Sequence, residues 1–122
     1  MDVAKLRIIG IDAEEGLAYC ADDEEFYDEM LDEYVHESRE KLEELIAAFG
    51  SRDWDRYRIS AHSLKSTSRM VGAKDISGKA YELEIAAKAG DESAIEALHS
   101  EFVDECARFA DALETYWDKG CS

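Results

Sequence analysis

The sequence contains no proline, and no stretch of apolar residues is long enough to cross a bilayer. A membrane-spanning helix needs about 20 consecutive apolar residues, so none is predicted. The first residues, MDVAKLRIIGIDAEEG, also lack the long apolar core of a secretion signal. We therefore expect a soluble, cytoplasmic protein. Because no proline removes a backbone donor or forces a kink, its helices can run straight over long stretches.

Basic residues and cysteines are both scarce. Lys and Arg total 14 against 30 Asp and Glu, which gives a formal net charge of −16. This charge repels phosphate backbones and anionic headgroups, so neither nucleic acid nor a membrane surface is expected as a partner. Cys20, Cys106 and Cys121 form no C-x-x-C pair and have no histidine at metal-ligand spacing. We expect reduced thiols that pack or stay idle, and no metal site.

Apolar residues recur at steps of three and four, the spacing of one helical face. The clearest stripe consists of Ile95, Leu98, Phe102, Cys106, Phe109, Leu113 and Tyr116. A second stripe consists of Phe26, Met30, Tyr34, Ser38, Leu42, Leu45 and Phe49. A third consists of Ile76, Ala80, Leu83 and Ala87, and a fourth of Ile59, Leu64, Thr67, Met70 and Val71. The stripes predict helices over 13–19, 23–49, 53–71, 74–89 and 92–117.

Turn and capping residues separate these stripes. Gly50, Gly72 and Gly90 are predicted to end helices, and Asp22, with Glu25 three residues later, resembles a capping box. Four amphipathic helices with short connections must be antiparallel neighbours. We therefore predict an all-α fold, an antiparallel up-down four-helix bundle with its core in about 23–117. The N-terminal segment is predicted to form a short extended stretch and a short helix that cover one end.

The length of 122 residues suits one domain with one core, so residues 1–122 are assigned to a single domain.

The main candidate for a chemically reactive residue in this domain is His62. Steps of 100° per residue along 53–71 place the fourth stripe on the buried face and His62 on the opposite side. Beside His62, the same construction places a small residue and three cationic residues: Ser66, Arg58, Lys65 and Arg69.

The segment from Arg52 to Lys74 carries six basic and two acidic residues, so it sums to +4 in a chain of −16. Positive charge beside an exposed imidazole suits an anion, or an acidic partner that delivers one. Neutral imidazole is nucleophilic near pH 7, and its attack on an activated phosphoryl group gives a phosphoramidate that can be passed on. The chain has no G-x-x-x-x-G-K-[ST] motif, so we expect neither an ATP site nor kinase activity.

Three short motifs include or follow His62: Ala61-His62-Ser63-Leu64-Lys65-Ser66, Gly72-Ala73 and Tyr81-Glu82-Leu83-Glu84. They resemble the A-H-x-L-K-G, G-A and L-E pattern of histidine-containing phosphotransfer (HPt) domains. Ser66 stands where the family usually has glycine. The segments Gly10-Ile11-Asp12, Gly16-Leu17, Phe26-Tyr27 and Met30-Leu31 resemble the usual lead-in, so the likeness covers about residues 8 to 115.

The resemblance implies a phosphorelay intermediate. His62 would accept a phosphoryl group from the aspartate of one response-regulator receiver domain and pass it to another, and Lys65 would favour the phosphorylated state. Arg58, Ser66 and Arg69 are assigned to partner docking. Glu84 lies near the position where some relatives place a polar residue that contacts the histidine.

The expected partners are receiver domains and a hybrid histidine kinase, and the chain itself is expected to be a monomer. Magnesium would be held by the receiver, and this chain would bind no cofactor.

Two other functions stay open. A non-catalytic adaptor would keep the bundle and bind a receiver without phosphotransfer, and the serine at position 66 is its one support in the sequence. The dimerising helical domain of a histidine kinase usually has an acid directly after the histidine and a proline soon afterwards, whereas His62 is followed by Ser63. His36 and His99 have no comparable cationic cluster, so both are interpreted as structural or incidental.

Overall fold

The computed structural model describes the backbone of residues 3–120 and the side chains of residues 3–116, so Cys121 lies outside it. The elements within this part are all helices. They are α1 (Val3–Ile9), α2 (Ala13–Tyr19), α3 (Glu24–Ser51), α4 (Trp54–Val71), α5 (Lys74–Ala89) and α6 (Glu92–Gly120). In this part of the chain no helix is both long and apolar enough to span a bilayer.

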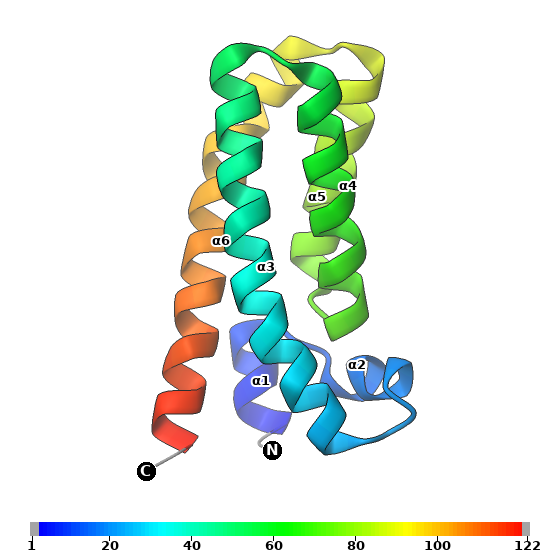
Figure 1. The fold of residues 1–122 in the computed structure, drawn as a ribbon, viewed down its shortest axis with the longest axis vertical. Coiled ribbons are helices and arrows are strands. Elements are labelled where there is room, and N and C mark those ends of the chain that lie inside the picture. The colour runs from blue at the N-terminus through cyan, green and yellow to red at the C-terminus, as the bar shows by residue number, and fades with distance from the viewer. Residues whose placement is uncertain (1–2, 121–122) are drawn as a thin grey trace.

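The four long helices form the predicted bundle. The chain runs up α3, down α4, up α5 and down α6, while α1 and α2 lie at the lower end (Figure 1). Contacts join α3 to α4, α4 to α5, α5 to α6 and α6 back to α3, so the four helices surround one core. The most extensive of these contacts is between α4 and α5, the two helices that carry the His62 motifs. The predicted all-α bundle is confirmed.

Aspartates cap the starts of α2, α3 and α4, and left-handed residues end α3, α4 and α5. Asp23 and Asp53 each accept a hydrogen bond from the backbone amide three residues later, at 3.2 Å. Two predicted boundaries are wrong: Asp23 rather than Asp22 caps α3, and α3 continues through Gly50 to a left-handed Arg52 with φ 58°. The Arg52 amide donates to carbonyls of the last turn, and its guanidinium lies 5.2 Å from the Phe49 ring, which stabilises this ending without glycine.

The N-terminal segment is helical where an extended stretch was predicted. Val3–Ile9 form α1, whose Leu6 is fully buried, and Gly10 turns the chain with φ 115°. The helix contacts α2 and α6, so it is stabilised by burying Leu6 against the end of the bundle rather than by its own length. The prediction that this segment covers one end of the bundle is confirmed.

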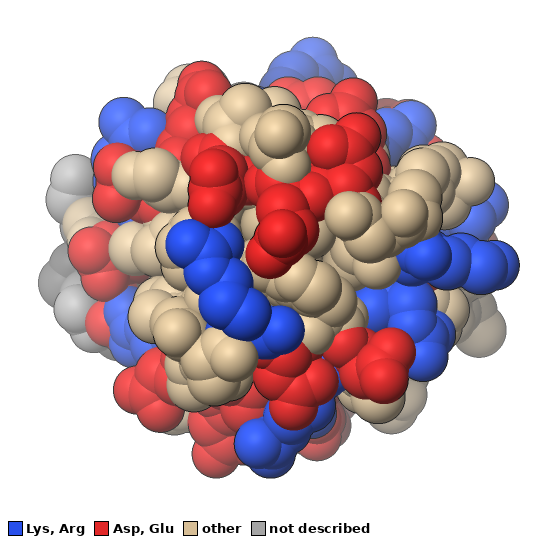
Figure 2. Space-filling model, turned by 90° about the horizontal axis from the view of Figure 1, so that it is seen from above, with Lys and Arg blue, Asp and Glu red and all other residues tan. Residues whose placement is uncertain are grey.

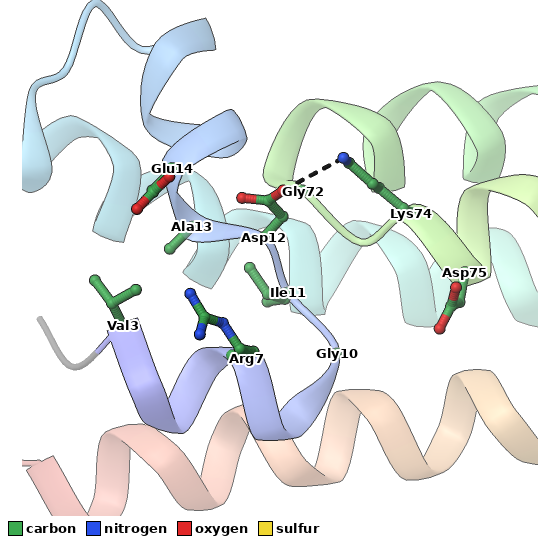
Figure 3. A pocket seen from close by; sticks show the side chains of 10 residues that line it. All are labelled: Val3, Arg7, Gly10, Ile11, Asp12, Ala13, Glu14, Gly72, Lys74 and Asp75. Carbon is green, nitrogen blue, oxygen red and sulfur yellow. Dashed lines mark ion pairs between the residues drawn. The ribbon is translucent and has the colours of Figure 1, made fainter.

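The turn between α4 and α5 is fixed to the start of α2. The Asp12 amide donates to the Gly72 carbonyl at 2.9 Å, and Tyr27 donates to the Val71 carbonyl at 2.7 Å. Lys74 lies 3.3 Å from the Asp12 carboxylate, beside a cavity of about 290 Å³ between α1, α2 and this turn (Figure 3). These contacts hold the lower end of α4 in place.

The stripes of α5 and α6 pack inward as predicted, but that of α4 is rotated. Leu64 and Val71 are buried, whereas Ile59 is 54% exposed and Met70 is 44% exposed. The buried face of α4 consists of Tyr57, Ser60, Ala61, Leu64, Ser68 and Val71. Small residues on this face let the neighbouring helices pack closely. The buried Ser68 hydroxyl forms a hydrogen bond with the Tyr34 hydroxyl at 2.8 Å. In α3, Phe26 is likewise 50% exposed, and Tyr27 and Leu31 occupy the core.

Candidate functional site

His62 stands on the solvent side of α4. Its neighbours Ala61 and Leu64 are 1% and 0% exposed, and they fix which face of the helix turns inward. The His62 side chain is 59% exposed, so its predicted exposure is confirmed even though the buried face lies elsewhere than predicted. A helix held by its core residues and by both of its ends presents the imidazole at a fixed place on the surface.

Glu84 of α5 is the closest partner of His62. Both carboxylate oxygens lie 3.0 Å from Nδ1 of His62, and they lie 3.1 and 3.2 Å from Nζ of Lys65. The Glu84 side chain is only 13% exposed. One half-enclosed carboxylate therefore binds both residues that the sequence assigns to phosphoryl chemistry.

This arrangement determines which ring nitrogen is available. Burial alone would raise the pKa of Glu84, but the hydrogen bonds and charges of His62 and Lys65 outweigh burial and hold that pKa below its ordinary value. Glu84 is therefore ionised at neutral pH, and an ionised carboxylate only accepts hydrogen bonds. In the neutral form of the ring, Nδ1 therefore carries the proton that Glu84 accepts, and Nε2 is the nitrogen with a free lone pair.

Lys65 is held from three sides. Its ammonium binds Glu84 and lies 5.1 Å from the centre of the Tyr81 ring, and its backbone carbonyl accepts a hydrogen bond from Ser77 at 2.9 Å. The side chain is 25% exposed. The ammonium thus lies next to the imidazole and keeps access to solvent, where it can meet the oxygens of an incoming phosphoryl group.

Three of the six basic residues counted between Arg52 and Lys74 are paired with acids from other helices. Arg52 pairs with Glu96 at 2.9 Å, Lys74 pairs with Glu15 at 2.5 Å, and Lys65 is bound by Glu84. At the end of the bundle seen in Figure 2, basic and acidic atoms are interspersed. Acids from other helices thus balance part of the positive charge of the segment from Arg52 to Lys74, while Arg56, Arg58 and Arg69 have no ion pair within the described side chains.

Arg58, Ser66 and Arg69 lie on α4, and no side-chain hydrogen bond or ion pair joins them to His62 in the described part of the chain. Arg58 and Ser66 are half-buried and Arg69 is exposed, and neither arginine has an ion pair within the described part of the chain. Between α4 and α5 lies a groove of about 530 Å³, whose lining is Glu15, Lys65, Arg69, Lys74, Ser77, Gly78 and Tyr81. Arg69 thus contributes to a groove that begins beside Lys65.

Large apolar side chains also lie near the histidine. Ile59 on α4 and Tyr81 and Ile85 on α5 are 54%, 50% and 48% exposed. This surface was not predicted from the sequence, because the helical spacing placed Ile59 in the core and Ile85 belongs to none of the four stripes. The exposure of these residues is decided by how α4 and α5 pack in the bundle, which their apolar character alone does not indicate.

The other two histidines have different surroundings. His99 is buried, stacks on Phe49 with ring centres 3.9 Å apart and binds the Tyr57 hydroxyl at 2.9 Å. Burial lowers the pKa of His99. His36 is exposed on α3, and its Nε2 lies 3.8 Å from Asp32. The structural interpretation of His99 is confirmed.

Together, the fold and the site define a helical-bundle protein that presents one nucleophilic ring nitrogen on the outside of a rigid helix. Residues 29–118, most of the chain, match the model of the Hpt domain. The chain therefore belongs to the Hpt domain family, whose function is phosphotransfer in two-component signalling.

Individual relatives agree with this assignment. The chain is 25% identical over 104 residues to the phosphorelay intermediate protein rdeA of Dictyostelium discoideum, a match that covers 83% of the chain and 41% of that protein. The chain thus spans less than half the length of this curated relative. Histidine-containing phosphotransfer protein B (HptB) from Pseudomonas aeruginosa has a similar structure, with a TM-score of 0.78 and 28% identity over 90% of this chain and 96% of that one.

A second solved structure is the HPT domain of a sensor hybrid histidine kinase from Shewanella. It superposes with a TM-score of 0.78 at 19% identity and covers 91% of this chain and 96% of its own. At this identity the likeness supports the fold alone.

Proposed function

We propose that this chain carries a phosphoryl group on Nε2 of His62, taken from the aspartyl phosphate of one receiver domain and given to the aspartate of another. The observation that carries the proposal is the contact of Glu84 with Nδ1 of an imidazole that is 59% exposed, because this contact occupies Nδ1 and leaves Nε2 as the nitrogen available for phosphorylation. In the transfer, Nε2 attacks phosphorus, the P–N bond forms, and the bond from phosphorus to the aspartate oxygen breaks. The aspartate leaves as a carboxylate, and the same steps run in reverse towards the acceptor.

Lys65 would neutralise the negative charge of the phosphoryl group during transfer. Its ammonium has three donors, so it can bind phosphoryl oxygens while it remains near Glu84. Positive charge placed where the transferring oxygens lie stabilises the transition state and the phosphorylated product. The chain provides no ATP-binding motif, so it would act as a carrier without autokinase activity.

The surface around His62 suits the docking of a folded partner. Ile59 and Ile85 supply exposed apolar area on both helices, and the unpaired Arg58 and Arg69 supply positive charge around it. Ser66, one turn after His62, is small enough to let a partner approach the ring. Receiver domains are the proposed partners, with a hybrid histidine kinase as one source of them. Magnesium would be held by the receiver and not by this chain.

Residues 1–122 would act as one phosphotransfer unit, a cytoplasmic monomer. A core already closed by α1 to α6 supports the proposal of a single unit and a monomer. Analytical ultracentrifugation tests this point, and an obligate dimer would instead favour the kinase dimerisation domain.

The direct test is transfer from a phosphorylated receiver domain in the presence of magnesium. We expect one phosphoryl group per chain, in a linkage that is labile in acid and stable in base. His62→Gln should abolish it, and His36→Gln, the change of another exposed histidine, should leave it unchanged. Labelling of His62→Gln would overturn the assignment of the site. Receiver binding without any adduct on the wild-type chain would favour the adaptor.

A further inference from the structure

Glu84 contacts the ring nitrogen that does not receive the phosphoryl group. Nδ1 lies across the imidazole from Nε2, so a phosphoryl group on Nε2 leaves the hydrogen bond to Glu84 in place. Both carboxylate oxygens lie 3.0 Å from Nδ1, and the side chain is only 13% exposed, which limits its exchange with water. The same carboxylate therefore faces the ring before and after phosphorylation.

Phosphorylation changes the charge of the ring at this contact. When Nε2 attacks while Nδ1 keeps its proton, both nitrogens become substituted and the ring carries a positive charge. If the proton stays, the ring later leaves phosphorus as neutral imidazole. If the proton is lost, the ring must leave as an imidazole anion, a far stronger base and a much poorer leaving group. Retention of one proton thus controls how readily the phosphoryl group moves on.

We propose that Glu84 keeps the proton on Nδ1 of phosphorylated His62, so that the phosphoryl group stays easily transferable above the pH at which an unassisted phosphoimidazole loses that proton. This inference rests on the proposed phosphorylation of His62. It makes Glu84 a positioning residue that acts through the ring, because it touches neither the phosphoryl group nor the partner.

The surrounding charges explain why a carboxylate is needed. The ammonium of Lys65 contacts Glu84, and its positive charge disfavours a second positive charge on the His62 ring. The other ionisable side chains within one turn of His62 or Glu84 on α4 and α5 are Arg58, Tyr81, Glu82 and Lys88. Titratable groups that reach these two helices from α2 and its cap, α3 and α6 are Asp12 and Glu15 at Lys74, Tyr27 at Val71, Tyr34 at Ser68, Glu92 at Trp54, His99 at Tyr57 and Glu105 at Lys79. Of all these groups, Glu84 is the carboxylate that contacts the ring.

The test removes the charge and keeps the hydrogen bond. In Glu84→Gln, the amide oxygen can still accept from Nδ1, so the free tautomer and the fold are preserved while the negative charge is lost. Glu82→Gln is the matched control, since it removes an exposed carboxylate two residues away on the same helix. Phosphoramidate, which gives its phosphoryl group to imidazole and leaves as ammonia, loads each protein without a receiver. The Nδ1 titration of the phosphorylated ring is then followed by ³¹P and ¹⁵N NMR.

We expect the ring of the wild type and of Glu82→Gln to lose its proton at a pH about one unit higher than that of Glu84→Gln. Transfer to an acceptor receiver should therefore be about tenfold slower for Glu84→Gln at alkaline pH, and equal to the wild type at pH 6, where both rings are protonated. A purely structural role for Glu84 would lower transfer equally at every pH.

Superimposable titrations and pH profiles would overturn the inference while leaving phosphorylation of His62 intact. Failure of His62 to accept phosphate from any donor would instead overturn the proposed function. If Glu84→Gln does not fold, the wild type alone decides, because a phosphorylated ring that has already lost its Nδ1 proton at about pH 7 contradicts the inference.

Discussion

At the scale of single residues, the site depends on one carboxylate serving two partners. Glu84 binds His62 and Lys65 at nearly equal distances, 3.0 to 3.2 Å. Its charge is balanced by the ammonium of Lys65, which stabilises a carboxylate that is only 13% exposed. A phosphoryl group on Nε2 brings two further negative charges, and the ammonium of Lys65 then has two acceptors to satisfy.

Lys65→Met should therefore shift the phosphotransfer equilibrium away from His62. The methionine keeps an unbranched apolar stem beside Tyr81 and removes the ammonium. A hydrogen bond to a charged group contributes about 1.5–3 kcal/mol, so the phosphorylated fraction at equilibrium with a donor receiver should fall about tenfold or more. Lys79→Met is the matched control, because Lys79 forms a comparable pair with Glu105 at 2.7 Å on α5 and α6. An unchanged phosphorylated fraction in Lys65→Met would contradict this role.

His99 gives the stability of the fold a dependence on pH. Burial lowers its pKa from the ordinary value of 6.5, so in mildly acidic solution the unfolded chain binds a proton that the folded chain does not. Stability is then fully present above about pH 6.5 and decreases as the pH falls towards the folded pKa, by up to about 1.4 kcal/mol per pH unit. Urea unfolding between pH 7.5 and 5.5 should show this loss in the wild type and in His36→Gln. If His99→Gln loses the same stability between pH 7.5 and 5.5, groups other than His99 cause the pH dependence.

At the scale of elements, α4 is the helix on which the site depends, and it is held at both ends. Asp53 caps its start, and Gly72 ends it with φ 90° against the backbone of Asp12. The contact is so close that a Cβ on Gly72 would lie 2.2 Å from the Asp12 carbonyl oxygen. Glycine is required here both for the left-handed conformation and for the approach of the N-terminal segment.

Gly72→Ala should destabilise the fold. The left-handed conformation alone costs an alanine about 1 kcal/mol, and the clash with Asp12 must displace backbone, so a total loss of about 2–4 kcal/mol is expected in urea unfolding. Gly78→Ala is the control: it lies within α5, nothing approaches its Cβ position within 4 Å, and the change should stabilise by up to about 1 kcal/mol. A neutral Gly72→Ala would mean that the turn adjusts freely.

The elements also show what the sequence predicts well. The stripes of α5 and α6 are regular and apolar, so their inward faces were predicted correctly. The inward face of α4 was predicted incorrectly. It includes Ala61 and Ser68, which are buried because the neighbouring helices pack closely there and not because they are strongly apolar. The exposure of His62 was still predicted, since it lies far from both the predicted and the actual face. Its contact with Glu84 depends on the relative placement of α4 and α5, which the spacing within one helix does not contain.

At the scale of the whole molecule, the negative charge is concentrated in the N-terminal part. Fifteen of the 30 carboxylates lie between Asp12 and Glu44. Several on α3 are exposed and one turn apart, as Glu29 and Glu33 are, so they repel one another in the folded state. On the later helices, five acids form ion pairs in the described part of the chain: Glu84, Glu96, Glu105, Asp111 and Glu114. The excess negative charge therefore lies mainly in the segment from Asp12 to Glu44 and not on α4 and α5, the helices that carry the site.

Reducing this repulsion should stabilise the molecule in a salt-dependent way. In the double variant Glu29→Gln, Glu33→Gln, we expect a gain of about 0.5 kcal/mol in the free energy of unfolding at 10 mM salt, from one like-charge pair and the field of its neighbours. At 1 M salt the Debye length is about 3 Å, so the gain should vanish. Glu105→Gln, which removes an ion-paired acid, should give no such gain. Because these changes lie on α3, phosphotransfer through His62 should be unaffected, and a gain that persists at 1 M salt would point to helix propensity instead of charge.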